Sequence, residues 1–408
     1  MKRLLSWCLI LVLCLGLAAC GGKPAGTVTP GTDARPTPTD TTHHKLGVIV
    51  YNTGDEEVIG FREYLQGYIE DNFPMVEFVY SDSIRSREQE LEFIRGACAQ
   101  GVDGFLSFLS QDLQAEVALC QENSVYYVLA SGTVSEADFD AVADNPWFLG
   151  MFGPGQPFEY QAGADMARYF LREQTGTRYF ILTGGAAMGN EMHYQRTLGI
   201  LDTLSNAYGV SLAQNRQELA GSVEPVTRDM EKFSITLCPG YVSREEYLNR
   251  AKETYASGEF DAVLCVLPPA EMVSAVGSTP TGVVDSYNTR NLQLFNDGTL
   301  RFVVGKFSSL AGPAFALMLN AVTGHAGEFR DKGRAIQVTQ GFWVSDSRED
   351  YLEKYALSQS AAMNAYNFDD LSKVICIYNP KANLNELVAL AEACSYRAVQ
   401  ARRENGAA

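Results

Sequence analysis

The chain has 408 residues, of which 46% are hydrophobic and 20% charged, and its formal net charge is −17. An acidic surface repels phosphate backbones and anionic headgroups, which argues against nucleic acid or an anionic lipid surface as a partner. The length exceeds what one hydrophobic core usually serves, so two domains or lobes are expected.

The N-terminus has the pattern of an export signal. Lys2 and Arg3 precede an apolar run over residues 4–19, which ends in small residues before Cys20. This run is shorter than the roughly 20 residues of a bilayer span, although a short uncut anchor is the alternative. Because it ends at a cysteine, the stretch resembles a bacterial lipoprotein signal. The resemblance implies removal of residues 1–19 and acylation of Cys20 by fatty chains such as palmitate, which would hold the chain to the cell membrane outside the cytoplasm.

Residues 20–44 are rich in Pro, Gly and Thr and nearly lack aliphatic side chains. Such a segment cannot bury enough apolar surface to offset its ordering entropy, so a disordered tether is predicted. The folded part is expected to begin near Lys45.

Strand and helix patterns then alternate. Residues 46–51 form a continuous apolar run, which is typical of a strand buried in a parallel sheet. The patterns predict strands at 46–51, 76–80, 104–109, 125–130 and 147–152, and helices at 56–71, 85–100 and 112–122.

The alternation restarts after residues 153–157, Gly-Pro-Gly-Gln-Pro, a natural crossing between lobes. The second series predicts helices at 156–173, 191–208, 244–257 and 271–276, and strands at 178–183, 233–238, 262–267, 282–285 and 302–304. This order favours an α/β protein with two doubly wound, parallel-sheet, Rossmann-like lobes joined by a hinge.

Six cysteines follow Cys20, with no Cys-x-x-Cys pair and no Cys/His cluster at metal-binding spacing. Most of them lie in apolar strand or helix patterns, where buried free cysteine is common. Mostly free thiols are therefore expected, with no metal and no cofactor.

Several strings, in their order and spacing, resemble the type 1 periplasmic-binding-protein family, most closely the sugar-binding lipoproteins of ABC importers. They lie at residues 45–50, 101–106, 194–199, 260–263 and 303–307. The resemblance covers roughly residues 45–324. It implies an N-terminal lobe of residues 45–153 with 308–324 and a C-terminal lobe of residues 154–307. Beyond residue 324 the chain departs from the family. This extension, 325–408, is expected to complete the second lobe or to cover one edge, and its pattern predicts a helix from residue 383 to about 402.

In open α/β sheets, ligands bind beyond the carboxyl ends of the strands, so polar residues after predicted strands are the site candidates. They are Tyr51, Asn52, Asp55, Gln111, Asp112, Ser131, Asn190, Arg196, Asp285 and Lys306. The resemblance favours Asn52, Gln111, Arg196 and Asp285 among them. Asp112 fits a helix N-cap equally well, and Arg196 could instead form a salt bridge with Glu191 or Asp202.

No nucleophile elbow, His-Glu-x-x-His motif or phosphate-binding loop occurs, and His193 and His325 fit surface histidines better than general bases. The chain is therefore not expected to be an enzyme. The resemblance implies a monomeric solute-binding protein that delivers a small polar ligand, above all a sugar, to an ABC permease. Its alternatives are a ligand sensor for a membrane kinase and a nucleoside binder.

Overall fold

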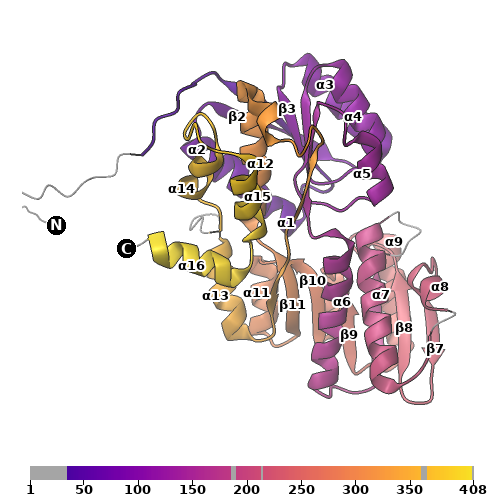
Figure 1. The fold of residues 1–408 in the computed structure, drawn as a ribbon. Helices are drawn as coiled ribbons and strands as arrows, with labels where there is room; N and C mark the ends of the chain where they lie inside the picture. The colour runs from indigo at the N-terminus through magenta and orange to yellow at the C-terminus, as the bar shows by residue number, and fades with distance from the viewer. Residues whose placement is uncertain (1–34, 185–189, 213–214, 360–364, 407–408) are drawn as a thin grey trace, which may run out of the picture. The chain divides into compact units, whose positions relative to one another are not determined.

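The computed structural model describes residues 35–184, 190–212, 215–359 and 365–406. The chain divides into an N-terminal part that ends at Thr37 and a compact unit, Pro38–Ala408, which is described below (Figure 1). The predicted signal peptide, Cys20 and most of the predicted tether lie outside the described residues. Among the described helices, none combines the length and apolar character that a membrane crossing requires.

The first lobe is built on a six-stranded parallel sheet in the order β12-β5-β4-β3-β1-β2. Its strands are β1 (His44–Val50), β2 (Val76–Ser83), β3 (Gly104–Ser107), β4 (Tyr126–Leu129), β5 (Phe148–Gly153) and β12 (Ile336–Thr339). The central strands are buried on both faces, which explains their unbroken apolar runs.

Helices connect these strands, and capping side chains fix where the helices begin. Asp55, Ser86, Asp112 and Ser135 each accept a hydrogen bond from a first-turn N–H group. The helical segments are α1 (Glu56–Arg62), the π-helical η1 (Glu63–Ile69), α2 (Glu70–Asn72), α3 (Arg87–Ala99), α4 (Leu113–Glu122) and α5 (Glu136–Val142).

The second lobe has a seven-stranded sheet in the order β13-β11-β10-β9-β6-β8-β7, in which only the edge strands β7 and β13 are antiparallel to their neighbours. The strands are β6 (Arg178–Thr183), β7 (Val226–Asp229), β8 (Ser234–Pro239), β9 (Ala262–Cys265), β10 (Thr281–Ser286), β11 (Leu300–Lys306) and β13 (Trp343–Ser345). The predicted α/β class with two doubly wound, mainly parallel sheets is confirmed.

Helices α6 and α7 pack unusually close together. A Cβ atom on Gly163 of α6 would lie 1.9 Å from the Arg196 carbonyl oxygen, and one on Gly199 of α7 would lie 2.0 Å from the Tyr160 carbonyl oxygen. The helices of this lobe are α6 (Gly155–Arg172), α7 (Glu191–Tyr208), α8 (Arg216–Ala220), α9 (Glu245–Ala256), η3 (Ala270–Met272), α10 (Val273–Val276) and α11 (Thr289–Asn296).

The chain passes between the sheets more than once. It leaves the first sheet after β5 and returns after β11 through η4 (Ser308–Ala311) into α12 (Gly312–Asn320), which contacts β3, β4 and β5. Segments η5 (Ala321–His325) and η6 (Ala326–Phe329) follow. Strand β12 then joins the first sheet and β13 the second, so the segment after residue 324, expected to complete the second lobe, supplies one strand to each sheet.

The C-terminal segment also contacts both lobes. Helix α13 (Arg348–Ser358) contacts α11 and β13, whereas α15 (Leu384–Glu392) contacts α12 and β12. Between and after them lie α14 (Phe368–Leu371), η7 (Ser372–Val374) and α16 (Tyr396–Gly406).

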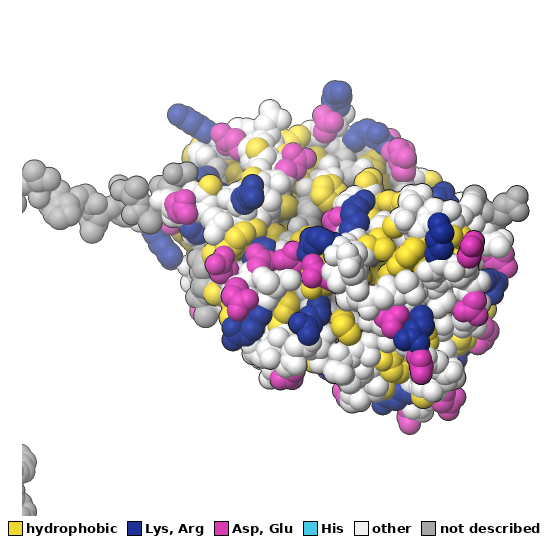
Figure 2. Space-filling view, turned by 90° about the horizontal axis from the view of Figure 1, so that it is seen from below, with side chains coloured by type: hydrophobic (Ala, Val, Ile, Leu, Met, Phe, Trp, Pro, Cys, Tyr) yellow, Lys and Arg dark blue, Asp and Glu magenta, His cyan; other side chains and the backbone are white. Residues whose placement is uncertain are grey.

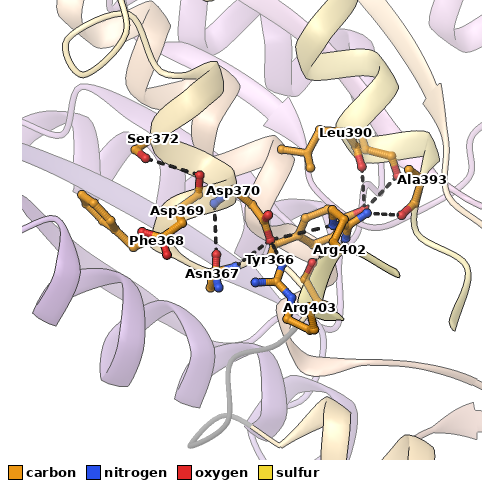
Figure 3. A network of polar contacts seen from close by, with 12 residues as sticks. Tyr366, Asn367, Phe368, Asp369, Asp370, Ser372, Leu390, Ala393, Arg402 and Arg403 are labelled. Carbon is orange, nitrogen blue, oxygen red and sulfur yellow. Dashed lines mark hydrogen bonds and ion pairs between the residues drawn. The ribbon is translucent and has the colours of Figure 1, made fainter. Parts of the chain in front are cut away.

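Polar contacts fasten α16 to the chain around α14 (Figure 3). Arg402 donates to the carbonyl oxygens of Ala393 and Ala365 at 2.5 and 2.6 Å, and Arg403 pairs with Asp370. Asp370 also closes the capping box with Asn367.

Helix α14 is held in turn against the first lobe. Tyr64 and Tyr68 of η1 reach it, because the Tyr64 hydroxyl donates to the Tyr366 carbonyl oxygen at 2.7 Å and the Phe368 N–H donates to the Tyr68 hydroxyl at 2.9 Å. The tail is therefore an integral part of the folded unit.

Some local predictions were wrong. A single helix was expected from residue 383 to about 402, but the chain breaks between α15 and α16, where Trp343 Nε1 donates to the Cys394 carbonyl oxygen at 2.8 Å. Elements α5, β7, α8 and α11 were not predicted. The expectation of free thiols is met, since the six cysteines of the described residues are unpaired.

Figure 2 shows acidic and basic side chains interspersed on one face of the molecule.

Candidate ligand site between the strand ends

The carboxyl ends of strands from both sheets meet near the start of α1. This helix follows β1 directly, its N-cap is Asp55, and its residues contact β10 of the second lobe. Lys306, the last residue of β11, donates to Glu57 Oε1 at 3.1 Å. Both side chains of this ion pair are largely buried, with 6% and 13% of their surface exposed. The first turn of α1 and the ends of β10 and β11 therefore form one polar group across the two lobes.

Two carboxyl groups of this cluster lie on opposite lobes. Burial is the main cause that raises the pKa of Asp55 to about 6, and the charge of the neighbouring Glu57 is the second cause. Burial, followed by the charge of Asp55, raises the pKa of Asp285 to about 7. The Asp55 carboxylate thus disfavours the charged form of Asp285, as expected of like charges brought together away from water.

Each carboxyl group also has donors from its own lobe. The Tyr51 hydroxyl donates to Asp55 Oδ1 at 3.1 Å, and the Glu57 N–H donates to the same oxygen at 2.9 Å. Asn291 Nδ2 donates to Asp285 Oδ2 at 2.7 Å, whereas the nearest donor to Asp285 Oδ1 is the Ser286 hydroxyl at 3.4 Å. The cluster is richer in acceptors than in donors, a pattern that suits a ligand with several hydroxyl groups.

A small cavity lies beside this cluster. It measures about 10 Å³ and is lined by residues that include Glu57, Ser286, Lys306 and Ser308. That volume holds about one water molecule. A solute larger than one water molecule does not fit this cavity.

Arg196 is buried inside the second lobe. Its Nε donates to Glu159 Oε2 at 2.5 Å and its Nη1 to the Val266 carbonyl oxygen at 2.8 Å. Its guanidinium carbon lies 5.8 Å from the centre of the Phe342 ring, which belongs to the segment between β12 and β13. The salt bridges considered from the sequence, to Glu191 or Asp202, are wrong, because Glu159 takes that place.

The start of α7 adds two polar groups. Asn190 caps the helix by accepting from the His193 N–H at 3.1 Å, and its Nδ2 donates to the Tyr241 hydroxyl at 3.1 Å. His193 is buried rather than on the surface, and its Nδ1 has no hydrogen-bond partner. Burial, with smaller effects of Arg196 and Lys306, lowers its pKa well below the usual value. The His193 imidazole is therefore neutral.

The remaining candidates lie at other strand ends of the first lobe. Asn52 accepts from the Gly54 N–H at 3.1 Å and shapes the turn after β1. The Gln111 side chain is exposed, and Asp112 caps α4 while it pairs with Arg87 at 2.6 Å. Ser131 is buried after β4, and its hydroxyl has no hydrogen-bond partner.

The loop after β3 is held by a second carboxyl pair. Glu116 accepts from the N–H groups of Gln111 and Asp112 at 2.9 and 2.8 Å and from the Tyr127 hydroxyl at 2.9 Å. Glu90 accepts from the same Gln111 N–H at 3.0 Å. Burial, followed by the neighbouring Glu116, raises the pKa of Glu90 to about 9, so Glu90 is protonated at neutral pH.

Sequence reasoning missed Glu57 and Glu159. Glu57 lies in the first turn of the helix predicted at residues 56–71, and no local pattern shows that Lys306 meets it across 249 positions. Glu159 lies 37 positions before Arg196 and meets it only through the close packing of α6 and α7. One usable signal was a glutamate on the apolar face of the helix predicted at residues 156–173, since an unpaired buried carboxylate is costly.

Comparison with known proteins places this fold. No protein-family model matches the chain, and no curated protein matches it in sequence. Among solved structures, the periplasmic binding protein of the arabinose ABC transporter from Shewanella sp. ANA-3 is similar, with a TM-score of 0.56 and 14% identity over 78% of this chain and 96% of that one.

Two further structures agree. A solute-binding protein from Bacillus halodurans C-125 with bound myo-inositol gives a TM-score of 0.55 and 15% identity over 78% of this chain and 99% of that one. A solute-binding protein from Agrobacterium vitis with bound D-fucose gives a TM-score of 0.56 and 14% identity over 77% of this chain and 99% of that one. The chain thus has the type 1 periplasmic-binding-protein fold, as the sequence strings suggested.

Proposed function

We propose that the chain is a lipid-anchored, extracytoplasmic solute-binding protein that captures a sugar or a similar polyhydroxylated solute between its lobes and delivers it to an ABC permease. The observation that carries this proposal is the buried group of Asp55, Glu57, Asp285 and Lys306, which two lobes supply jointly. The export signal ending at Cys20 supports the anchoring.

The ligand class follows from this group. Two carboxyl groups that lie close together on opposite lobes disfavour closure when both are charged, because like charges repel in a desolvated site. Hydroxyl groups of a ligand can donate to Asp55 and Asp285 together, and so favour the closed arrangement over the open one. A solute with a net negative charge would add repulsion. A neutral, hydroxyl-rich solute fits best.

We assign the direct ligand contacts to Tyr51, Asp55, Asp285 and Lys306. Asn52, Ser131 and Asn190 border them, and Arg196 is a supporting group whose ion pair with Glu159 holds α7 in place. Gln111 and Asp112 belong to the outer rim on the first lobe, where Asp112 has a structural role as helix cap. The chemistry needed is binding and release, with no covalent step.

A thermal-shift screen of the full chain in detergent micelles tests the proposal. The panel contains furanose and pyranose sugars, inositol, nucleosides and sugar acids. A sugar or inositol at 100 times its Kd should add about 2.7 kcal/mol to the free energy of unfolding, whereas sugar acids should add much less. The proposal fails if no sugar or inositol shifts the transition. A response confined to nucleosides would replace the sugar with that class.

A further inference from the structure

Three side chains of different chemistry meet far from the proposed ligand site. His325 ends η5, Glu328 lies in η6, and Cys376 follows η7, and their potential ligand atoms all lie within 4.8 Å of one another. His325 Nδ1 is 3.0 Å from Glu328 Oε1. The next residues of the chain bind near the amino end of β5, since Arg330 donates to the Phe148 carbonyl oxygen at 2.8 Å. The cluster therefore lies toward the end of the first sheet opposite to the strand ends that face the ligand.

Cys376 is held in position by its backbone. Its N–H donates to Asn320 Oδ1 at 2.7 Å, and Asn320 Nδ2 donates to the Val374 carbonyl oxygen at 2.8 Å. Asn320 is fully buried at the end of α12, so this double contact fixes the distance between α12 and the tail. The thiol position is thus built into the packing of the lobe.

The other two side chains of the cluster, His325 and Glu328, follow soon after α12. Gly324 has a φ of 93°, a left-handed conformation that glycine adopts without strain, and it turns the chain so that His325 and Glu328 lie beside Cys376. Their side chains are 35% and 62% exposed. Both can therefore adjust their positions at little cost.

Thiolate, imidazole and carboxylate are together the donor set of zinc rather than of calcium or magnesium, which prefer oxygen alone. Zinc bonds of about 2.0–2.3 Å place tetrahedral ligand atoms roughly 3.3–3.6 Å apart. We propose that His325, Glu328 and Cys376 bind a zinc-type divalent ion, with water as the fourth ligand. Binding releases the thiol proton to solvent and fastens the C-terminal tail to the end of α12.

Cobalt titration of the full chain in detergent micelles tests this site, because tetrahedral Co²⁺ bound to thiolate absorbs in the visible and near ultraviolet. One equivalent of Co²⁺ should produce both absorptions, and Zn²⁺ should displace it. Cys376→Ser should abolish the thiolate absorption. His325→Gln should weaken Co²⁺ binding at least about tenfold. Cys394→Ser, which removes another buried thiol of the tail, should leave the spectrum unchanged.

The alternative is an ordinary ion pair between His325 and Glu328 beside a buried thiol. In that case the native chain shows no tetrahedral Co²⁺ spectrum, or it shows a spectrum that the substitution His325→Gln does not change. Either result overturns the proposal. His325→Gln keeps the test decisive if Cys376→Ser does not fold, since His325 is partly exposed. Zn²⁺ should also raise the Tm of the native chain and not that of His325→Gln. Sugar binding is measured separately and does not enter this result.

Discussion

Among the residues that the structure describes, two buried carboxyl pairs differ in where their partners come from. Glu90 and Glu116 lie within the first lobe, and main-chain N–H groups of the same lobe donate to them. Asp55 and Asp285 come from different lobes, and the charge of Asp55 raises the pKa of Asp285. The comparison separates two kinds of buried polar group in this fold. We expect carboxyl groups whose charged neighbours come from the same lobe to stabilise the fold. Carboxyl groups whose charged neighbour lies on the other lobe should respond instead to lobe closure and to ligand.

Replacing Arg196 should cause the largest loss of stability, because Arg196 belongs to the first kind. Its partner Glu159 is fully buried, so Arg196→Ala leaves an uncompensated carboxylate inside the second lobe. We expect the free energy of unfolding to fall by about 3–5 kcal/mol, measured by denaturant unfolding.

The matched control is Arg168→Ala on α6, which removes an exposed ion pair with Asp165 and should cost no more than about 1 kcal/mol. If Arg196→Ala kept its stability and lost only sugar binding, Arg196 would belong with the cross-lobe groups, and the distinction would fail for this residue.

Disturbing the packing of α6 against α7 should cause the next largest loss of stability, because this packing holds the pair of Arg196 and Glu159 within the second lobe. Gly199→Ala places a Cβ 2.0 Å from a backbone oxygen, so the two helices must move apart. We expect a loss of about 1–3 kcal/mol in the free energy of unfolding. Gly96→Ala in α3 meets no atom within 4 Å and should be neutral or stabilising by up to about 1 kcal/mol. Equal effects of the two substitutions would contradict the close packing.

These two predictions show where the sequence was informative. The unbroken apolar run at β1 identified a buried parallel strand, and the repeated alternation identified both lobes, because these signals are local. The partner of Arg196 was not predictable, since it depends on how two helices pack through Gly163 and Gly199. The same holds for Glu57 with Lys306. Strand-end reasoning named Asp55 and Asp285 as candidates, and the structure brings them near each other, because parallel topology gathers the carboxyl ends of strands whatever the loops between them.

The pH dependence of stability tests the role of Glu90 in the fold of the first lobe. Its pKa is raised from 4.5 to about 9 in the folded chain, so the folded state holds a proton that the unfolded state releases between these values. This contribution to stability is fully present below about pH 4.5 and is lost as the pH rises through about 9. Denaturant midpoints measured from pH 6 to 9 should fall more steeply in the native chain than in Glu90→Gln. Glu92→Gln, which alters an exposed position of the same helix, should keep the native slope.

Asp285 should show the smallest effect on folding and the largest effect on binding. Its folded pKa of about 7 lies above the ordinary 3.8, so its stabilising contribution is complete below about pH 3.8 and is lost as the pH rises through about 7. Asp285→Asn cannot acquire this charge. Above pH 7 it should therefore unfold with at least the native free energy, because the Asp55 carboxylate then faces a neutral amide.

The same substitution should abolish the sugar-induced rise in Tm. The amide oxygen would stay with Asn291, and the amide nitrogen, which cannot accept a hydroxyl hydrogen bond, would face the ligand. Asp297→Asn, an exposed change after α11, should retain that rise. A marked loss of stability in Asp285→Asn without ligand would place Asp285 with Glu90 and Glu116 as a group that serves the fold of one lobe. Retained stability with lost binding is the behaviour expected of a group shared by two lobes, because such a group pairs with the ligand in addition to its own lobe.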